Sequence, residues 1–181
     1  SSNIIYIDPY KITKKTQDAD IILITHDHYD HFDLPSIKNI MKEDTIIIMP
    51  NTMVYKAIEN KIDREKILGV NPNEKYYIND LNISTTYSYN IDKDFHSKKK
   101  NYVGYIIELN EERIYIAGDT DCVEELKNLN YICPIQVKEQ LLSDINELKE
   151  LHDFAEIIPI SATKNDNVDL LINCIKIFVS N

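Results

Sequence analysis

The chain has 181 residues, of which 43% are hydrophobic, and it carries 30 acidic against 20 basic side chains. The apolar fraction is enough for one sizeable core and excludes a disordered chain. The formal net charge of −10 argues against nucleic acid and against anionic membranes as partners, because binding phosphates requires a surplus of Lys and Arg.

The cysteines and glycines argue against a disulfide-stabilised domain and against a nucleotide site built on a glycine-rich loop. Three widely spaced cysteines do not form a disulfide framework, and no signal peptide opens the sequence, so a cytoplasmic location is expected. No run approaches the ~20 apolar residues of a membrane span. Gly69, Gly104 and Gly118 are the three glycines of the chain, and they lie too far apart to form a glycine-rich phosphate loop.

Short apolar runs bounded by polar residues, Pro or Gly predict strands through most of the first 117 residues. The predicted strands are 4–7, 21–24, 45–49, 67–70, 75–78, 81–89, 102–109 and 113–117. The run at 21–24 is apolar throughout, which suits a strand buried on both faces. Asn79-Asp80 is typical of a hairpin turn.

Helix signals fall between these strands and again near the C-terminus. Asp33 as an N-cap predicts a helix ending at about Met41, and Asn51 is expected to cap a helix over 53–60. Beyond Asn130 the pattern predicts a C-terminal αβα segment, with helices over 138–151 and 168–179 and a strand over 156–160. Alternating strands and helices make the chain an α/β (α+β) mixture.

The residues with the clearest metal chemistry directly follow the second predicted strand. Three histidines and two aspartates lie within 25–31. Side chains alternate along an extended segment, so His26 and His28 point the same way, while Asp30 and His31 project from the adjacent turn. Imidazole and carboxylate groups are ligands of zinc, iron and manganese. Two offset ligand pairs predict two cations a few ångströms apart; a polar surface loop with coincidental histidines is the alternative.

The cluster resembles the H-x-H-x-D-H metal motif of the metallo-β-lactamase superfamily, here His26-Asp27-His28-Tyr29-Asp30-His31. Ile5-Tyr6-Ile7-Asp8-Pro9 upstream and Ala117-Gly118-Asp119-Thr120-Asp121 downstream stand in the order of the UlaG-like branch, the metal-dependent hydrolases. The resemblance covers about residues 4–129. It implies an αββα sandwich with the metals at one edge, between the two sheets.

The resemblance also implies a role for each candidate ligand. The first metal would be held by His26, His28 and His96, and the second by Asp30 and His31, with Asp119 bridging the two. Asp30 and Asp119 would be the catalytic residues. Two cations, expected to be Zn²⁺ with Mn²⁺ or Fe²⁺ compatible, lower the pKa of a shared water and give a hydroxide nucleophile.

Several of these residues have a purely structural alternative. Asp119 could cap a helix starting near Cys122, and His96 could be a solvated loop histidine. Tyr89, Asn90 and Tyr102 are candidates for the mouth of a pocket for a small anionic substrate, although tyrosines in strands commonly serve packing.

The chain departs from this family pattern after residue 130. The last histidine of the family has no recognisable counterpart, since His152 lies in an unmatched context, so the sandwich is predicted to be truncated. Residues 137–180, with Ser161-Ala162 after the predicted strand, resemble the end of the G domain of Era-type GTPases. We therefore expect an incomplete metal-binding domain over 1–130 and an Era-like segment over 131–181, as in a fusion or chimera.

Three functions follow from these patterns. The first is a dinuclear, zinc-dependent hydrolase of the metallo-β-lactamase superfamily. The second is a catalytically inactive metal-binding fragment or chimera, and the third, judged from the tail alone, is a guanine-nucleotide-binding protein related to Era. No pattern in the sequence specifies an oligomeric state.

Overall fold

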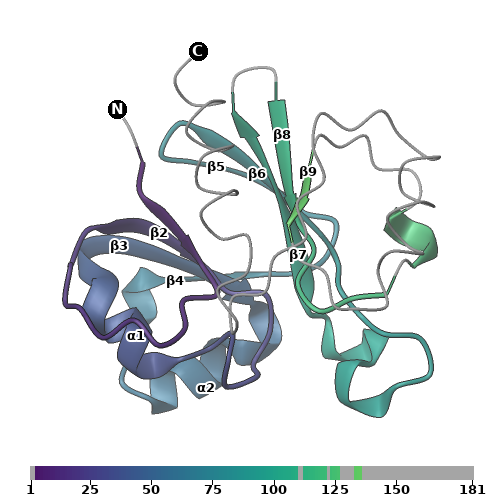
Figure 1. Ribbon diagram of the computed structural model, residues 1–181, viewed down its shortest axis with the longest axis horizontal. Helices are drawn as coiled ribbons and strands as arrows, with labels where there is room; N and C mark the ends of the chain where they lie inside the picture. The colour runs from purple at the N-terminus through teal and green to yellow at the C-terminus, as the bar shows by residue number, and fades with distance from the viewer. Residues whose placement is uncertain (1–2, 110–111, 122, 127–132, 136–181) are drawn as a thin grey trace.

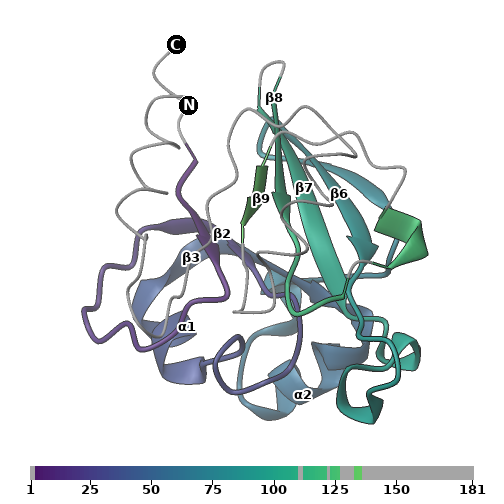
Figure 2. The same cartoon turned by 45° about the vertical axis from the view of Figure 1, so that its right-hand side comes forward.

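The computed structural model describes residues 3–109, 112–121, 123–126 and 133–135. Two β-sheets stack face to face, and helices cover the outer face of the first sheet (Figures 1 and 2). This arrangement confirms the predicted α/β fold with two sheets. The C-terminal αβα segment, the domain boundary at 130 and His152 involve residues outside these ranges and stay predictions.

The first sheet is parallel. Its strands, in the order in which they lie, are β1 (Ile5–Ile7), β2 (Ala19–Leu23), β3 (Met41–Pro50) and β4 (Ile67–Val70). Parallel neighbours require crossover connections, and α1 (Leu34–Ile40) and α2 (Val54–Glu59) lie in two of them. All four crossover-linked strands therefore end at the same edge of the sheet, where the ligand-rich segment begins.

Strand β2 is buried on both faces, as its unbroken apolar run predicted. Ile22 belongs to the core between the sheet and the two helices, together with Ile37 of α1 and Ala57 of α2. Ile21 and Leu23 belong to the second core, which fills the space between the two sheets.

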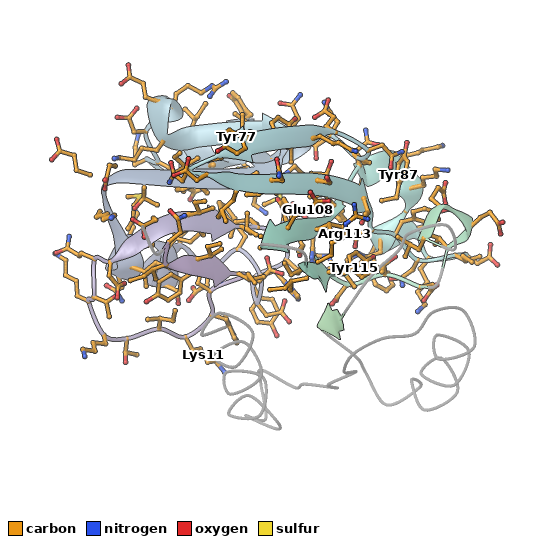
Figure 3. The ribbon with its side chains drawn as sticks, turned by 90° about the horizontal axis from the view of Figure 1, so that it is seen from above. Lys11, Tyr77, Tyr87, Glu108, Arg113 and Tyr115 are labelled. Atoms are coloured by element: carbon orange, nitrogen blue, oxygen red, sulfur yellow. The ribbon has the colours of Figure 1, made fainter. Side chains whose placement is uncertain are left out.

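The second sheet is antiparallel apart from its last pair. Its strands, in spatial order, are β5 (Lys75–Ile78), β6 (Leu81–Tyr87), β7 (Val103–Leu109), β8 (Glu112–Ile116) and β9 (Cys133–Ile135), and β9 runs parallel to β8. Asn79 and Asp80 link β5 to β6 with φ angles of 48° and 65°, which confirms the predicted hairpin turn. Figure 3 shows Glu108 and Arg113 side by side on β7 and β8, where they form an ion pair of 2.9 Å.

Tyr105 of β7 connects the two sheets through its hydroxyl group. Its side chain is fully buried, and its hydroxyl lies 2.7 Å from the carbonyl oxygen of Ile24 and 3.1 Å from that of Ile48. This hydroxyl donates to the first sheet, because carbonyl oxygens only accept hydrogen bonds. The hydroxyl of this buried tyrosine is therefore satisfied where β7 packs against the first sheet.

Two helix predictions differ in detail from the structure. Helix α1 ends at Ile40, because Met41 already begins β3. Asn51 does not cap α2; it opens a 3₁₀ turn over Asn51–Met53, and Met53 is the N-cap. Strand β4 packs closely here, since a Cβ at Gly69 would lie 2.6 Å from the Asn51 side-chain oxygen. Within the described residues, no helix is long and apolar enough to cross a bilayer.

Candidate metal centre

The ligand-rich segment is anchored to both sheets where it leaves β2. The backbone N–H of Ile24 donates to Ile48 of β3 over 2.9 Å, and that of Val103 in β7 donates to Thr25 over 3.1 Å. Thr25 is fully buried. The chain therefore reaches the first candidate ligand in a fixed direction, at the edge shared by the two sheets.

A tight turn then returns the chain toward its starting point. The carbonyl oxygen of His28 accepts from the backbone N–H of His31 at 3.1 Å and of Phe32 at 2.8 Å. This turn places the His31 ring beside that of His26, with centroids 3.9 Å apart. Four predicted ligands are thus delivered by one short segment.

His96 arrives from the second sheet, in the connection between β6 and β7. It ends a 3₁₀ turn over Asp94–His96 and is only 1% exposed, so the solvated alternative for this histidine is wrong. Its ring lies 4.6 Å from that of His26 and 4.5 Å from that of His28, measured between centroids. Burial next to two other imidazoles is what a ligand position requires.

Asp119 follows β8 through a turn that requires glycine. Gly118 has a φ of +66°, and a Cβ there would lie 3.0 Å from both the Ser88 hydroxyl and the Cβ of Thr25. The Ser88 hydroxyl donates to the carbonyl oxygen of Asp119 over 3.3 Å. The turn therefore packs directly against the ligand-rich segment and brings the carboxylate of Asp119 to the histidines.

The loops that carry His96 and Asp119 are hydrogen-bonded to each other. The Asp121 carboxylate accepts from the side-chain amide of Asn90 and from the backbone N–H of Ile91, both at 2.8 Å. The Thr120 hydroxyl accepts from the backbone N–H of Tyr89 at 3.0 Å. Asp121 thus links the two loops. The alternative that Asp119 caps a helix starting near Cys122 involves a residue outside the described ranges and stays a prediction.

Four side chains converge on one point. His26, His28, His96 and Asp119 each offer one ligand atom, and these atoms lie within 4.8 Å of one another. Nε2 of His96 is 3.2 Å from Nδ1 of His28 and 3.9 Å from the Asp119 carboxylate. Zinc bonds to such nitrogen and oxygen atoms at about 2.0–2.2 Å. The donor set therefore fits a divalent cation after small side-chain adjustments.

Asp119 also faces His31, a predicted ligand of the second metal. Its Oδ1 lies 3.6 Å from Nε2 of His31, while its Oδ2 lies 4.0 Å from Nε2 of His26. Asp30 approaches the same His31 nitrogen at 4.0 Å. The two oxygens of one carboxylate are thus directed to two ligand groups, the geometry of a residue that can bridge two cations.

Asp8 supports both groups, a role that the sequence did not indicate. Its carboxylate accepts from the backbone N–H of Thr25 at 2.8 Å, from the Thr25 hydroxyl at 2.7 Å and from Nδ1 of His31 at 2.8 Å. In the sequence, Asp8 belonged to the Ile5-Tyr6-Ile7-Asp8-Pro9 segment of the family resemblance, which gave it no role at the metal site. The positive φ of 42° that turns it toward Thr25 depends on the folded structure.

These bonds determine which nitrogen of two histidines faces the candidate cation site. His31 donates through Nδ1, because the Asp8 carboxylate can only accept. The Thr25 hydroxyl gives its hydrogen to Asp8, so at His26 Nδ1, 2.9 Å away, it accepts. Both rings thus keep the hydrogen on Nδ1 and leave Nε2 directed toward Asp119. Metal-binding histidines are commonly fixed in this way through their second nitrogen.

Neighbouring charges shift the pKa of two side chains in this region. Burial disfavours the charged form of His31, but the hydrogen bond to Asp8 and the nearby carboxylates outweigh it and raise its pKa. Burial also opposes ionisation of Asp27, yet hydrogen bonds from Tyr102 and Lys56 lower its pKa below the usual value. Asp27 is therefore an anion at neutral pH.

The three candidate pocket residues have partners within the protein. The Tyr89 hydroxyl donates to Glu125 at 2.9 Å, and Asn90 donates to Asp121. Tyr102 is 3% exposed, and its hydroxyl donates to Asp27. A role for these residues in lining a pocket stays a prediction.

Comparison with known proteins agrees with this architecture. A metal-dependent hydrolase of the UPF0173 group from Sulfolobus acidocaldarius is 28% identical over 123 residues, which are 67% of this chain and 52% of the relative. The crystal structure of a protein from Parabacteroides distasonis ATCC 8503, classed with metal-dependent hydrolases, is similar with a TM-score of 0.72 and 26% identity, over 87% of this chain and 73% of that one. Igni18, a metallo hydrolase from Ignicoccus hospitalis KIN4/I, has a similar fold, with a TM-score of 0.62 and 17% identity over 86% of this chain and 73% of that one.

The chain spans about half the length of the curated relatives that it matches. The family described as the Beta-lactamase superfamily domain matches residues 4–155, most of the chain and past residue 130, where the sequence pattern changes. The chain therefore belongs to the β-lactamase superfamily.

Proposed function

We propose that the protein is a metal-dependent hydrolase that uses two divalent cations, with zinc the preferred metal. The observation that carries this proposal is the convergence of His26, His28, His96 and Asp119 within 4.8 Å, with His31 on the other side of the same carboxylate. The relatives named as metal-dependent hydrolases support it. Zinc agrees with a donor set of imidazoles and carboxylates, which Mn²⁺ and Fe²⁺ also accept.

Divalent cations held here would lower the pKa of a bound water and polarise the bond under attack. The protein's own contribution is to place the cations and to orient the water. The two oxygens of the Asp119 carboxylate face two different groups of ligands. Asp30, which is 33% exposed and lies 4.0 Å from His31, can accept a hydrogen bond from an attacking water. Asp8 holds His31 in the tautomer with a free Nε2.

The proposed substrate is a small anionic molecule with a hydrolysable ester, phosphoester or lactone bond. A chain with a net charge of −10 attracts an anion only where cations dominate the local field, so substrate binding should require the metals. We also propose a cytoplasmic location, as expected from the sequence. The Era-like segment over 131–181 falls mainly outside the described residues, and guanine-nucleotide binding through it stays a prediction.

The test is a metal titration combined with a hydrolysis assay. The protein is stripped with a chelator and reloaded with Zn²⁺, Mn²⁺ or Fe²⁺, and metal content and hydrolysis of phosphodiester, ester and lactone substrates are measured. We expect about two ions per chain and activity that returns with the metal. A single weakly held ion without activity would favour the inactive metal-binding fragment, and no bound ion would contradict both readings.

A further inference from the structure

Asp27 occupies the position between the first two histidines of the motif, and two side chains from other parts of the fold hold it. Lys56 of α2 donates to the Asp27 carboxylate at 3.0 Å and to the Asp27 carbonyl oxygen at 2.9 Å. The Tyr102 hydroxyl, from the residue before β7, donates to the other carboxylate oxygen. One lysine therefore fixes both the main chain and the side chain between His26 and His28.

Tyr102 also contacts the histidines directly. Its ring centroid lies 5.4 Å from those of His26 and His96, and 6.4 Å from that of His28. The tyrosine is almost wholly buried, so its ring has a single position against all three imidazoles. The bond to Asp27 thus couples the orientation of this ring to the segment that carries two of the ligands.

An exposed ion pair would not by itself justify a functional role. Side-chain exposures of 46% for Lys56 and 33% for Asp27 place that pair among those that add little to stability. What distinguishes this pair is its location. The backbone of Asp27 is bonded directly to both neighbouring ligands, so a shift of this backbone would also shift His26 and His28. Two residues hold Asp27 in place, the buried Tyr102 through its hydroxyl and Lys56 of α2 through its ammonium group.

We propose that Asp27, Lys56 and Tyr102 form a positioning network that holds His26, His28 and His96 in the geometry of a metal site. The inference rests on the proposed function, since it concerns how tightly that site binds its cation. None of the three residues is a predicted metal ligand; each acts through the histidines. Supporting residues of metal sites typically change metal affinity by about 10–100-fold when they are removed.

The test compares Tyr102→Phe, Lys56→Met and Asp27→Ala with the wild-type chain. Zn²⁺ affinity is measured by chelator competition, and the absorption spectrum of the Co²⁺-loaded protein reports the geometry around the cation. Tyr77→Phe is the matched control, because Tyr77 also donates its hydroxyl to an aspartate, Asp80, but does so on the exposed hairpin of β5.

We expect Tyr102→Phe and Lys56→Met each to lower the affinity about tenfold, and Asp27→Ala by up to about 100-fold. All three should alter the Co²⁺ spectrum, while metal-free Tyr102→Phe still unfolds in one cooperative urea transition. Tyr102→Phe should add little to Asp27→Ala, because the hydroxyl acts through Asp27. Tyr77→Phe should change neither the affinity nor the spectrum.

The inference would be overturned if the wild type bound metal and Tyr102→Phe and Lys56→Met showed the same affinity and spectrum. The proposed function would then still stand. Full additivity of Tyr102→Phe and Asp27→Ala would also overturn it, because the two residues would then act independently. A wild-type chain that binds no Zn²⁺ or Co²⁺ would remove the proposed function, and the inference with it.

Discussion

The two sheets supply the candidate metal centre in different ways. The parallel sheet provides His26, His28, Asp30 and His31 in one continuous segment that follows β2. The antiparallel sheet provides one ligand from each of two loops, and contacts such as the hydrogen bonds of Asp121 join these loops. A contiguous ligand set depends on the position of one strand, whereas a dispersed set depends on how the whole sheet packs.

The largest effect should follow from removing the contiguous ligands. His26→Ala combined with His28→Ala removes two of the four converging groups, so Zn²⁺ affinity should fall by more than the ~100-fold limit of supporting residues. Metal content after gel filtration, measured by mass spectrometry, checks this. Unchanged metal content in the double variant would show that the cations bind elsewhere.

Removing His96, a ligand from the antiparallel sheet, tests how much that sheet contributes to metal binding. His96→Ala leaves His26, His28 and Asp119 in place, so affinity should fall by about 10–100-fold, less than in the double variant. The measurement is again chelator competition with Zn²⁺. If His96→Ala bound metal as well as wild type, the antiparallel sheet would contribute Asp119 alone.

The features of the parallel sheet and the hairpin could be predicted from the sequence, because they depend on residues that are close together in the chain. The apolar run before Thr25 predicted a strand buried on both faces, and the spacing of His26, His28 and His31 predicted a ligand cluster after it. Asn79-Asp80 predicted its hairpin because a two-residue turn depends on its own backbone angles.

The remaining features depend on distant contacts and left no local signal. Asp8 supports His31 across 23 positions of sequence, and Lys56 reaches Asp27 across 29. The 3₁₀ turn at Asn51 replaces the predicted cap where Gly69 of β4 packs against it. Such partners are set by how the strands and helices pack, which the order of residues alone does not display.

Replacing two consecutive strand residues with Ala should change the unfolding free energy differently in the two sheets. Ile21 and Ile22 are both fully buried, on opposite faces of β2, so replacing either one with Ala should cost about 2–5 kcal/mol of unfolding free energy. In β6, Ile83→Ala should cost a similar amount, but Asn82→Ala only about 0.5 kcal/mol or less, because Asn82 is exposed. Urea unfolding measures all four; equal losses at Asn82 and Ile83 would contradict the alternating burial at the start of β6.

A smaller effect is expected where the sheets meet. Tyr105→Phe removes the one hydroxyl that joins β7 to Ile24 and Ile48 and leaves those buried carbonyls with one partner fewer, which should cost about 1–2 kcal/mol. Tyr77→Phe, on an exposed hydroxyl, is the control and should be nearly neutral. Equal unfolding free energies for the two variants would mean that the inter-sheet hydrogen bond contributes nothing.

The smallest effect concerns an ion pair within the parallel sheet. The backbone N–H of Ile4 and the Lys42 ammonium hydrogen-bond to the Asp20 carboxylate and lower its pKa. A lowered pKa stabilises the fold above the unfolded-state value, near pH 3.9, and that contribution is lost as the pH falls through the folded-state pKa. The wild-type urea midpoint should therefore fall slightly more steeply below about pH 4 than that of Asp20→Asn. Identical pH profiles would show that this pair does not stabilise the fold.

The central claim is that His26, His28, His96 and Asp119 together bind a divalent cation, with a second ion beside His31 and Asp30. Anomalous diffraction from zinc-grown crystals, collected on both sides of the zinc absorption edge, tests it most directly. The account predicts a strong peak among the first four side chains and a second on the His31 side of Asp119. Fully ordered side chains with no anomalous peak at either position, in crystals that contain zinc elsewhere, would contradict it.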